Sequence, residues 1–94
     1  KDLVGMTVQD LTEALAGSLG YEGESGVVVS AVEQGSPAAE ADVKEGDLIK
    51  EVNREKIANV KEFKQVLGKP EKGKDILLLI RRGMHTRFVI IKSK

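Results

Sequence analysis

Residues 26–53, GVVVSAVEQGSPAAEADVKEGDLIKEVN, decide the fold, because they predict a strand, a short helix, a tight turn and a second strand in direct succession. The three adjacent valines at 27–29 are stiff at χ1 and favour a strand that is covered on both faces. Ser36 can cap the amides that follow it, and Pro37 fits the first helical position. Gly46 supplies a turn with positive φ before the strand Leu48–Asn53.

The residues before this segment predict one more strand and one more helix. Apolar and polar residues alternate over positions 6–11, which is typical of a strand with one buried face. Thr12 then caps a short helix, Glu13–Leu19, which Gly20 ends. A loop rich in glycine and glutamate leads from there into the valine strand.

The residues after this segment predict a helix and a closing hairpin. Asn59 opens the clearest helical pattern of the chain, with Glu62 three residues later as its capping-box partner. Gly83-Met84 suits a two-residue type II′ turn. The predicted elements are the brief strand Lys56–Ala58, the helix Val60–Leu67 ended by Gly68 and Pro70, and the strands Asp75–Arg82 and His85–Lys92. The whole pattern predicts an α+β fold of five or six strands and two or three helices.

The composition favours one small domain over residues 1–94, because 94 residues can bury one hydrophobic core but not two. Phe63 and Phe88 lie in apolar patterns that predict core positions. The longest apolar run, residues 76–80, is far shorter than the ~20 residues that span a bilayer, so we expect no direct membrane insertion. No basic-then-apolar leader opens the chain, so we expect any signal peptide to lie outside it.

The charges are segregated along the sequence although they sum to zero. Residues 1–55 hold 4 Lys+Arg against 12 Asp+Glu, a net charge of −8, and residues 56–94 hold 11 against 3, a net charge of +8. One interpretation is a dipolar surface with a basic face for acidic partners. We favour the other, in which the two halves interleave in the fold and the field largely cancels.

The residues that could carry catalysis or bind a cofactor are isolated. Gly23-Glu24-Ser25-Gly26 resembles the nucleophile loop of trypsin-like proteases, but His85 is the only histidine and lies in the predicted closing hairpin. One histidine and no cysteine leave no metal site, and the nearby glycines precede a strand rather than a phosphate-binding helix. The basic half lacks interleaved aromatic residues for nucleic acid. We therefore expect a non-enzymatic chain without cofactor, metal or nucleic-acid partner.

Leu3-Val4-Gly5-Met6, followed by a strand, is the remaining candidate site. Successive amides in a tight apolar-Gly-apolar loop can hold a peptide's terminal carboxylate, and the strand edge can pair with the peptide backbone. Glycine there would let the backbone approach the carboxylate closely. On these four residues alone we favour the other interpretation, an ordinary strand start with a glycine bulge.

The order of parts as a whole resembles a PDZ domain, a module that binds peptide C-termini, and in particular the PDZ domains of the HtrA/Do-type (Deg) serine protease family. The resemblance covers essentially the whole chain. It rests on the loop Leu3–Met6, on Gly35–Ala39 (GSPAA), on Gly46–Ile49 (GDLI) and on the groove helix Val60–Leu67. It implies a PDZ-like partial β-barrel of five to six strands, capped by two to three helices in the bacterial, permuted strand order.

The resemblance also implies roles for single residues. The loop that Leu3 opens would hold the carboxylate through the amides of Val4, Gly5 and Met6. Met6, Thr7 and Val8 would pair with the ligand backbone. Val60 and Leu67 would line an apolar pocket, and Lys64 would lie at its rim.

The implied partners are C-terminal peptides of unfolded or misassembled proteins, together with the protease domain and the other PDZ domains of a periplasmic parent oligomer. Gln9–Thr12, Glu51–Arg54 and Leu77–Gly83 look most like the second, C-terminal PDZ of two-PDZ members. An alternative is a structural module that docks protomers, with a weak or vestigial groove. A third places the domain in an intramembrane protease or secretion component.

Two positions depart from the family pattern. Asp42 stands where relatives commonly have a left-handed glycine, so we expect local strain or a shifted turn there. Leu3 stands where relatives often have an aromatic residue or glycine, which bears on the affinity for a carboxylate.

Overall fold

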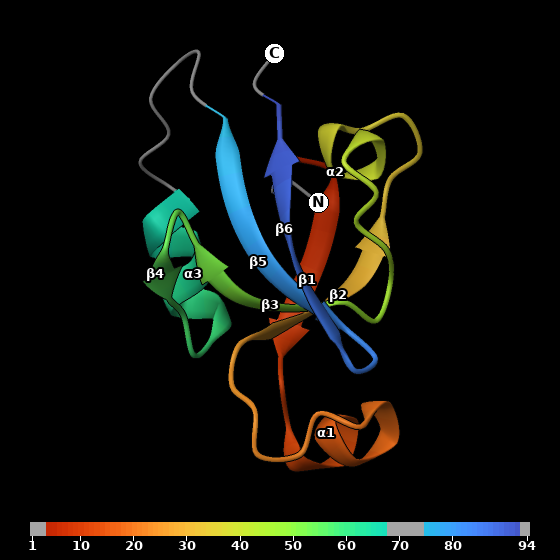
Figure 1. Cartoon of the computed structure of the whole chain (residues 1–94), viewed down its shortest axis with the longest axis vertical. Helices are drawn as coiled ribbons and strands as arrows, with labels where there is room; N and C mark the ends of the chain where they lie inside the picture. The colour runs from red at the N-terminus through yellow and green to blue at the C-terminus, as the bar shows by residue number, and fades with distance from the viewer. Residues whose placement is uncertain (1–3, 68–74, 93–94) are drawn as a thin grey trace.

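One curved antiparallel sheet with three helices around it makes up the fold (Figure 1). The structure is a computed structural model that describes residues 4–67 and 75–92. The strands follow the order β1-β2-β3-β5-β6, and β4 pairs with β3 beside this path. The elements are β1 Met6–Asp10, α1 Glu13–Leu19, β2 Val27–Val32, α2 Pro37–Glu40, β3 Leu48–Val52, β4 Glu55–Lys56, α3 Val60–Leu67, β5 Ile76–Arg82 and β6 His85–Ile91. The predicted α+β fold class of five or six strands and two or three helices is confirmed.

The predicted helix starts are confirmed by the caps. The Thr12 hydroxyl accepts from the Leu15 amide and the Ser36 hydroxyl from the Ala39 amide, both at 3.2 Å. Asn59 Oδ1 accepts from the Glu62 amide at 2.9 Å, and the Glu62 carboxylate accepts in return from the amide of Ala58, one residue before the cap. These local bonds satisfy donors that the first helical turn leaves open.

The strand predicted at Lys56–Ala58 lies at Glu55–Lys56, so it starts one residue earlier and ends two residues earlier than predicted. Asn53 and Arg54 both have positive φ, 51° and 69°, and Val52 pairs with Glu55. Such a two-residue turn starts the return strand at once, at Glu55. Ile57 lies outside β4, although its amide still donates to the Lys50 carbonyl of β3 at 3.2 Å, and its side chain is buried. The predicted Gly83-Met84 turn is confirmed, because Arg82 pairs with His85 and Gly83 has φ 62°. The proposed helix stops, Gly68 and Pro70, lie outside the described residues.

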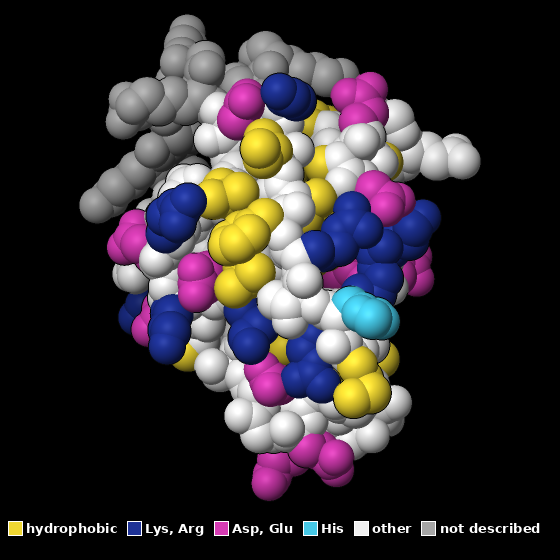
Figure 2. Space-filling view, viewed as in Figure 1, with side chains coloured by type: hydrophobic (Ala, Val, Ile, Leu, Met, Phe, Trp, Pro, Cys, Tyr) yellow, Lys and Arg dark blue, Asp and Glu magenta, His cyan; other side chains and the backbone are white. Residues whose placement is uncertain are grey.

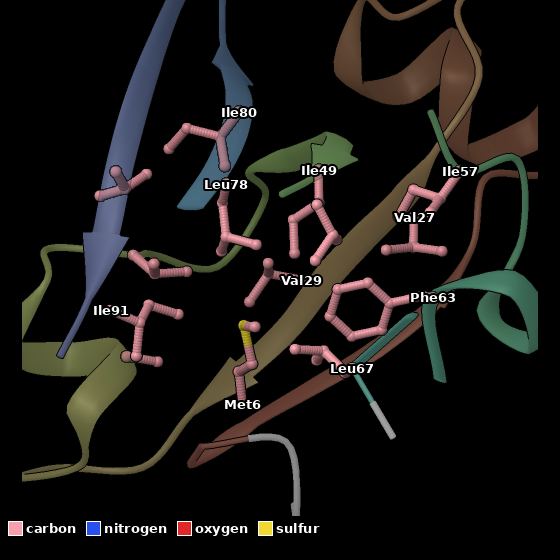
Figure 3. Packing of buried hydrophobic residues seen from close by; sticks show 14 residues of the cluster. Met6, Val27, Val29, Ile49, Ile57, Phe63, Leu67, Leu78, Ile80 and Ile91 are labelled. Atoms are coloured by element: carbon pink, nitrogen blue, oxygen red, sulfur yellow. The ribbon is translucent and has the colours of Figure 1, made fainter. Parts of the chain in front are cut away.

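The core consists of two clusters that meet at β2 and β3. The larger one packs the inner face of the sheet against α3, and Figure 3 shows Phe63 and Leu67 pointing toward Met6 and Val27. The smaller one lies under α1 and contains Ala16, Tyr21, Val28 and Leu48. Val27 and Val29 belong to the larger cluster and Val28 to the smaller one, so the valine run is covered on both faces as predicted.

Phe88 is not a core residue, contrary to the prediction. It lies on the outer face of β6 and is 55% exposed, and Ile90 on the same face is 51% exposed. The alternation along β6 turns Val89 and Ile91 inward, which places Phe88 outside. Figure 2 shows hydrophobic side chains gathered in a stripe over β5 and β6.

The acidic and basic halves interleave, as predicted. Arg82 forks onto the buried Asp47 carboxylate at 2.8 Å through both Nε and Nη2, and this pairing raises the pKa of Arg82. Glu24 pairs with Lys50 and with Arg81, each at 2.8 Å. Asp42 does take the left-handed conformation, φ 70°, and its carboxylate faces Lys44, Arg82 and Arg87. The turn is therefore kept with aspartate in place of glycine.

Candidate functional site

β1 is an edge strand, because the sheet order begins with it and β2 covers only one of its two sides. Helix α3 packs next to β1. We call the facing sides of β1 and α3 the candidate groove; the predicted site residues from Val4 to Val8 lie on or just before β1, and those from Val60 to Leu67 lie on α3.

The backbone of Met6 is directed toward the open edge. Met6 stands opposite Val32, and the next residue along, Glu33, donates its amide to the Gly5 carbonyl at 2.7 Å. In an antiparallel ladder this bond makes Met6 and Val32 a non-hydrogen-bonded pair, whose N–H and C=O groups point away from each other. The Met6 N–H and C=O therefore point away from β2.

A β-bulge separates Thr7 from Val8. The register shifts there, and the Ser30 hydroxyl donates to the Thr7 carbonyl at 3.1 Å. Thr7 pairs with Ala31, so its backbone faces β2 rather than the open edge. Val29, opposite Val8, uses its amide and carbonyl toward Asp47 and Gly46 on its other side. The groups of Val8 therefore point to the open edge, as those of Met6 do.

The loop before β1 has a left-handed backbone, with φ 52° at Val4 and 93° at Gly5. Its carbonyls are bound into the fold: Val4 O accepts from the Ala38 amide at 3.1 Å, and Gly5 O accepts from Glu33. Within residues 4–67 and 75–92, no hydrogen bond engages the Val4 or Gly5 amide as donor. Successive amides of such a backbone can form an anion-binding concavity. Leu3, the predicted start of this loop, lies outside the described residues.

The wall of the groove is apolar. Met6 and Leu67 are buried, and Val8 and Val60 are partly buried against the same core cluster. Lys64 is exposed on α3, and its place at the rim stays a prediction. The structure thus brings together the described members of the predicted site, with the Thr7 backbone turned away from the edge.

Asp10 joins the far end of β1 to the start of α3. Its Oδ1 accepts from the Val60 amide at 2.7 Å, across fifty residues of sequence. A carboxylate at this place complements the partial positive charge of the helix N-terminus. Sequence reasoning did not single out Asp10, and the only signal for it was its place at the end of the strand.

In the two described ranges, 4–67 and 75–92, no group of three His, Asp or Glu side chains could hold a metal ion. None of the helices in those ranges is long and apolar enough to cross a membrane.

An open strand edge with a left-handed loop at its start and an apolar helix beside it defines a PDZ-like architecture. Residues 3–92 match the PDZ domain family model. The chain belongs to the PDZ domain family.

Its relatives include parts of longer proteases. The chain is 44% identical over 91 residues to a protein of Chlamydia trachomatis serovar D described as "Probable periplasmic serine endoprotease DegP-like". The matched residues cover 96% of the chain and 18% of that relative. The chain is 33% identical over 79 residues to the protein of the same description from Rickettsia prowazekii, covering 84% and 15%. The chain thus spans about a fifth or less of the length of these relatives.

Solved structures with the same fold hold peptides. The HtrA3 PDZ domain bound to a phage-derived ligand, FGRWV, has a TM-score of 0.81 and 25% identity, with 97% of this chain and 83% of that chain covered. The HtrA-type protease AlgW with a decapeptide has a TM-score of 0.85 and 25% identity, with 95% and 27% covered. The chain is therefore related to the PDZ domains of HtrA/DegP-like periplasmic serine proteases.

Proposed function

We propose that this chain is the peptide-binding module of an HtrA/Do-like serine protease, and that it captures hydrophobic C-termini of unfolded or misassembled proteins by strand addition. The observation that carries the proposal is the direction of the Met6 backbone. Its N–H and C=O face the open edge directly after the left-handed Val4-Gly5 loop.

The ligand would extend the sheet as a strand antiparallel to β1. Its terminal carboxylate accepts from the amides of Val4, Gly5 and Met6. Its backbone then pairs with the outward groups of Met6 and Val8, because Thr7 is bound to β2 and Ser30. The backbone groups of two β1 residues point to the open edge, and pairing with them fixes the register of the ligand. In this register every second ligand side chain faces the groove.

The groove should select apolar residues at the terminal and antepenultimate ligand positions. Leu67 and Met6 flank the terminal position, and Val60 and Val8 flank the antepenultimate one. PDZ domains that select a hydroxyl at the antepenultimate position usually carry a histidine where Val60 stands, and valine offers only apolar contact. The peptide in the related HtrA3 complex, FGRWV, is apolar at the last position, which supports the terminal part of this choice; its antepenultimate residue is arginine, so it does not support the other part.

The role of the ligand's terminal carboxylate is tested by an NMR titration that compares one hydrophobic peptide with its C-terminally amidated copy. We expect the free acid to bind at least about ten-fold more tightly and to shift the Val4, Gly5 and Met6 amides most. Amidation removes an acceptor for charge-assisted bonds worth about 1.5–3 kcal/mol each. Equal affinity of the two peptides would contradict carboxylate capture.

We further propose that the parent chain is periplasmic and that this domain is its second, C-terminal PDZ, which feeds or regulates a protease domain. The names of the relatives support the compartment, and their greater length supports a longer parent. The chain itself acts as a non-catalytic module in this proposal and needs no cofactor.

The outer face of the β5–β6 hairpin favours a second candidate function, protomer assembly. Phe88 pairs with Leu79 across the hairpin and Ile90 pairs with Leu77, and β6 ends the sheet. Solvent-exposed apolar stripes of this kind mark interaction surfaces. Phe88→Thr with Ile90→Thr in the full-length parent would then reduce its oligomer size in analytical ultracentrifugation and leave peptide affinity unchanged. An unchanged oligomer would remove this candidate.

A further inference from the structure

The side chain of Asp10 links the strand side of the groove to the helix side. Side chains on a strand alternate between its two faces, so Asp10 lies on the same face as Met6 and Val8. Its carboxylate reaches the Val60 amide at 2.7 Å, at the first residue of α3. The row of groove-facing side chains on β1 therefore ends in a carboxylate that bridges to the helix.

This bridge has a fixed place in the register of the proposed ligand. With its carboxylate on the Val4-Gly5-Met6 amides, the ligand has its last residue level with Met6. The antepenultimate residue is then level with Val8, and the fifth residue from the end is level with Asp10. At that third level the space between strand and helix holds a carboxylate instead of an apolar wall.

We propose that Asp10 is a specificity-determining residue that closes the far end of the groove. It confines apolar selection to the terminal and antepenultimate positions, and it selects Lys or Arg at the fifth ligand residue from the end. This inference rests on the proposed peptide-binding function. Asp10 Oδ1 is held by the helix while Asp10 stays exposed, so a ligand ammonium or guanidinium at this level complements the carboxylate charge and an apolar side chain does not.

The test uses four seven-residue peptides that differ only at the fifth residue from the C-terminus, where they carry Lys, Gly, Leu or Glu. Affinities are measured by isothermal titration calorimetry at low salt. With the wild-type chain we expect Lys to bind about two- to five-fold more tightly than Gly, which is the range for an exposed ion pair, and Glu and Leu to bind no better than Gly.

Two substitutions separate the charge from the bridge. Asp10→Asn keeps an oxygen acceptor for the Val60 amide and removes the charge, so we expect it to lose the preference for Lys over Glu and still give no gain for Leu. Asp10→Ala removes both, so we expect Leu to become favoured over Gly. Glu13→Gln, which removes a charge from α1 three residues further on, is the matched control and should behave as wild type.

The results of these titrations distinguish a failure of the proposed Asp10 role from a failure of the proposed peptide-binding function. Peptides that bind with equal affinity whatever their fifth residue, or an Asp10→Ala chain with the wild-type order of preference, would overturn the role of Asp10 and leave peptide capture intact. If none of the peptides binds, the proposed function fails and this inference fails with it. The Val60 amide shift in each free variant confirms whether the bridge is present or lost.

Discussion

Gly5 has no room for a side chain. Its φ is 93°, and a Cβ placed there would lie 2.0 Å from the Ser36 Cβ and 2.4 Å from its hydroxyl oxygen. We expect Gly5→Ala to lower the free energy of unfolding by about 2–4 kcal/mol, because left-handed strain and overpacking each cost about 1–3 kcal/mol. Urea denaturation measures this loss.

Gly23→Ala provides the matched control for that substitution. Gly23 also has positive φ, 81°, but nothing lies within 4 Å of the position of its Cβ. It should therefore cost only the conformational part, about 1–2 kcal/mol. If the two variants lose the same stability, the contact between Gly5 and Ser36 has no energetic weight.

Residues with nearby partners were predictable from the sequence, and residues with distant partners were not. Thr12, Ser36 and Asn59 bond to amides three residues away, so a short pattern was enough to identify them. Asp10 bonds to an amide fifty residues away, and no local pattern contains that information. The left-handed conformation at Asp42 was expected from the family pattern, whereas the three basic residues around its carboxylate were not.

Helix α3 carries the groove wall on one face and Lys64 on its exposed surface. Lys64 lies one turn after Val60, so its aliphatic stem can cover the wall while its ammonium stays in water. We expect Lys64→Glu to weaken binding of peptides with an acidic residue a few positions upstream of the C-terminus, by about 0.2–1 kcal/mol, and to leave neutral peptides unchanged. Fluorescence anisotropy at low and high salt measures the affinity for both peptide classes. If Lys64→Glu changes the two affinities equally, Lys64 has no role in peptide selection.

Strands were predicted well as elements and less well in register. Alternation identified β1, but it could not reveal the bulge between Thr7 and Val8, because the extra residue, Ser30, is on the partner strand. The continuous apolar run in β6 likewise hid which side chains face out, and Phe88 was assigned to the wrong face. Which face of a strand is buried depends on what packs on it, and that is a tertiary property.

Across the whole molecule, ion pairs tie the acidic half of the chain to the basic half. Glu24 pairs with Arg81 of the basic half and with Lys50 of its own half, and the hydrogen bond from the Lys50 ammonium, with Arg81 beside it, holds the pKa of its carboxyl below the usual range. A lowered pKa in the folded state means that acid favours the unfolded chain. The stabilisation is therefore complete above the unfolded pKa of about 4.3 and is lost as the pH falls through the folded value.

We therefore expect the wild-type chain to be more stable than Glu24→Gln at pH 7, with a difference that shrinks steadily as the pH falls below about 4.3. Thermal unfolding followed by circular dichroism from pH 7 to pH 2 measures this difference. Glu22→Gln is the control, because Glu22 is a neighbouring exposed glutamate that forms no ion pair with another described residue. A gap between wild type and Glu24→Gln that stays constant with pH would contradict the prediction.

The position of Tyr21 gives the molecule a built-in optical reporter. It is the only tyrosine, the chain has no tryptophan, and the ring is buried under α1 with the Arg81 guanidinium 5.5 Å from its centre. Its emission therefore monitors the smaller cluster and is silent about the peptide groove. Neighbouring valines of β2 belong to different hydrophobic clusters. Neither cluster can therefore unfold without loosening β2, which both clusters share. Tyrosine emission and far-ultraviolet circular dichroism should thus give coincident thermal melting curves. Two separated curves would mean that α1 and the smaller cluster unfold while the groove stays folded.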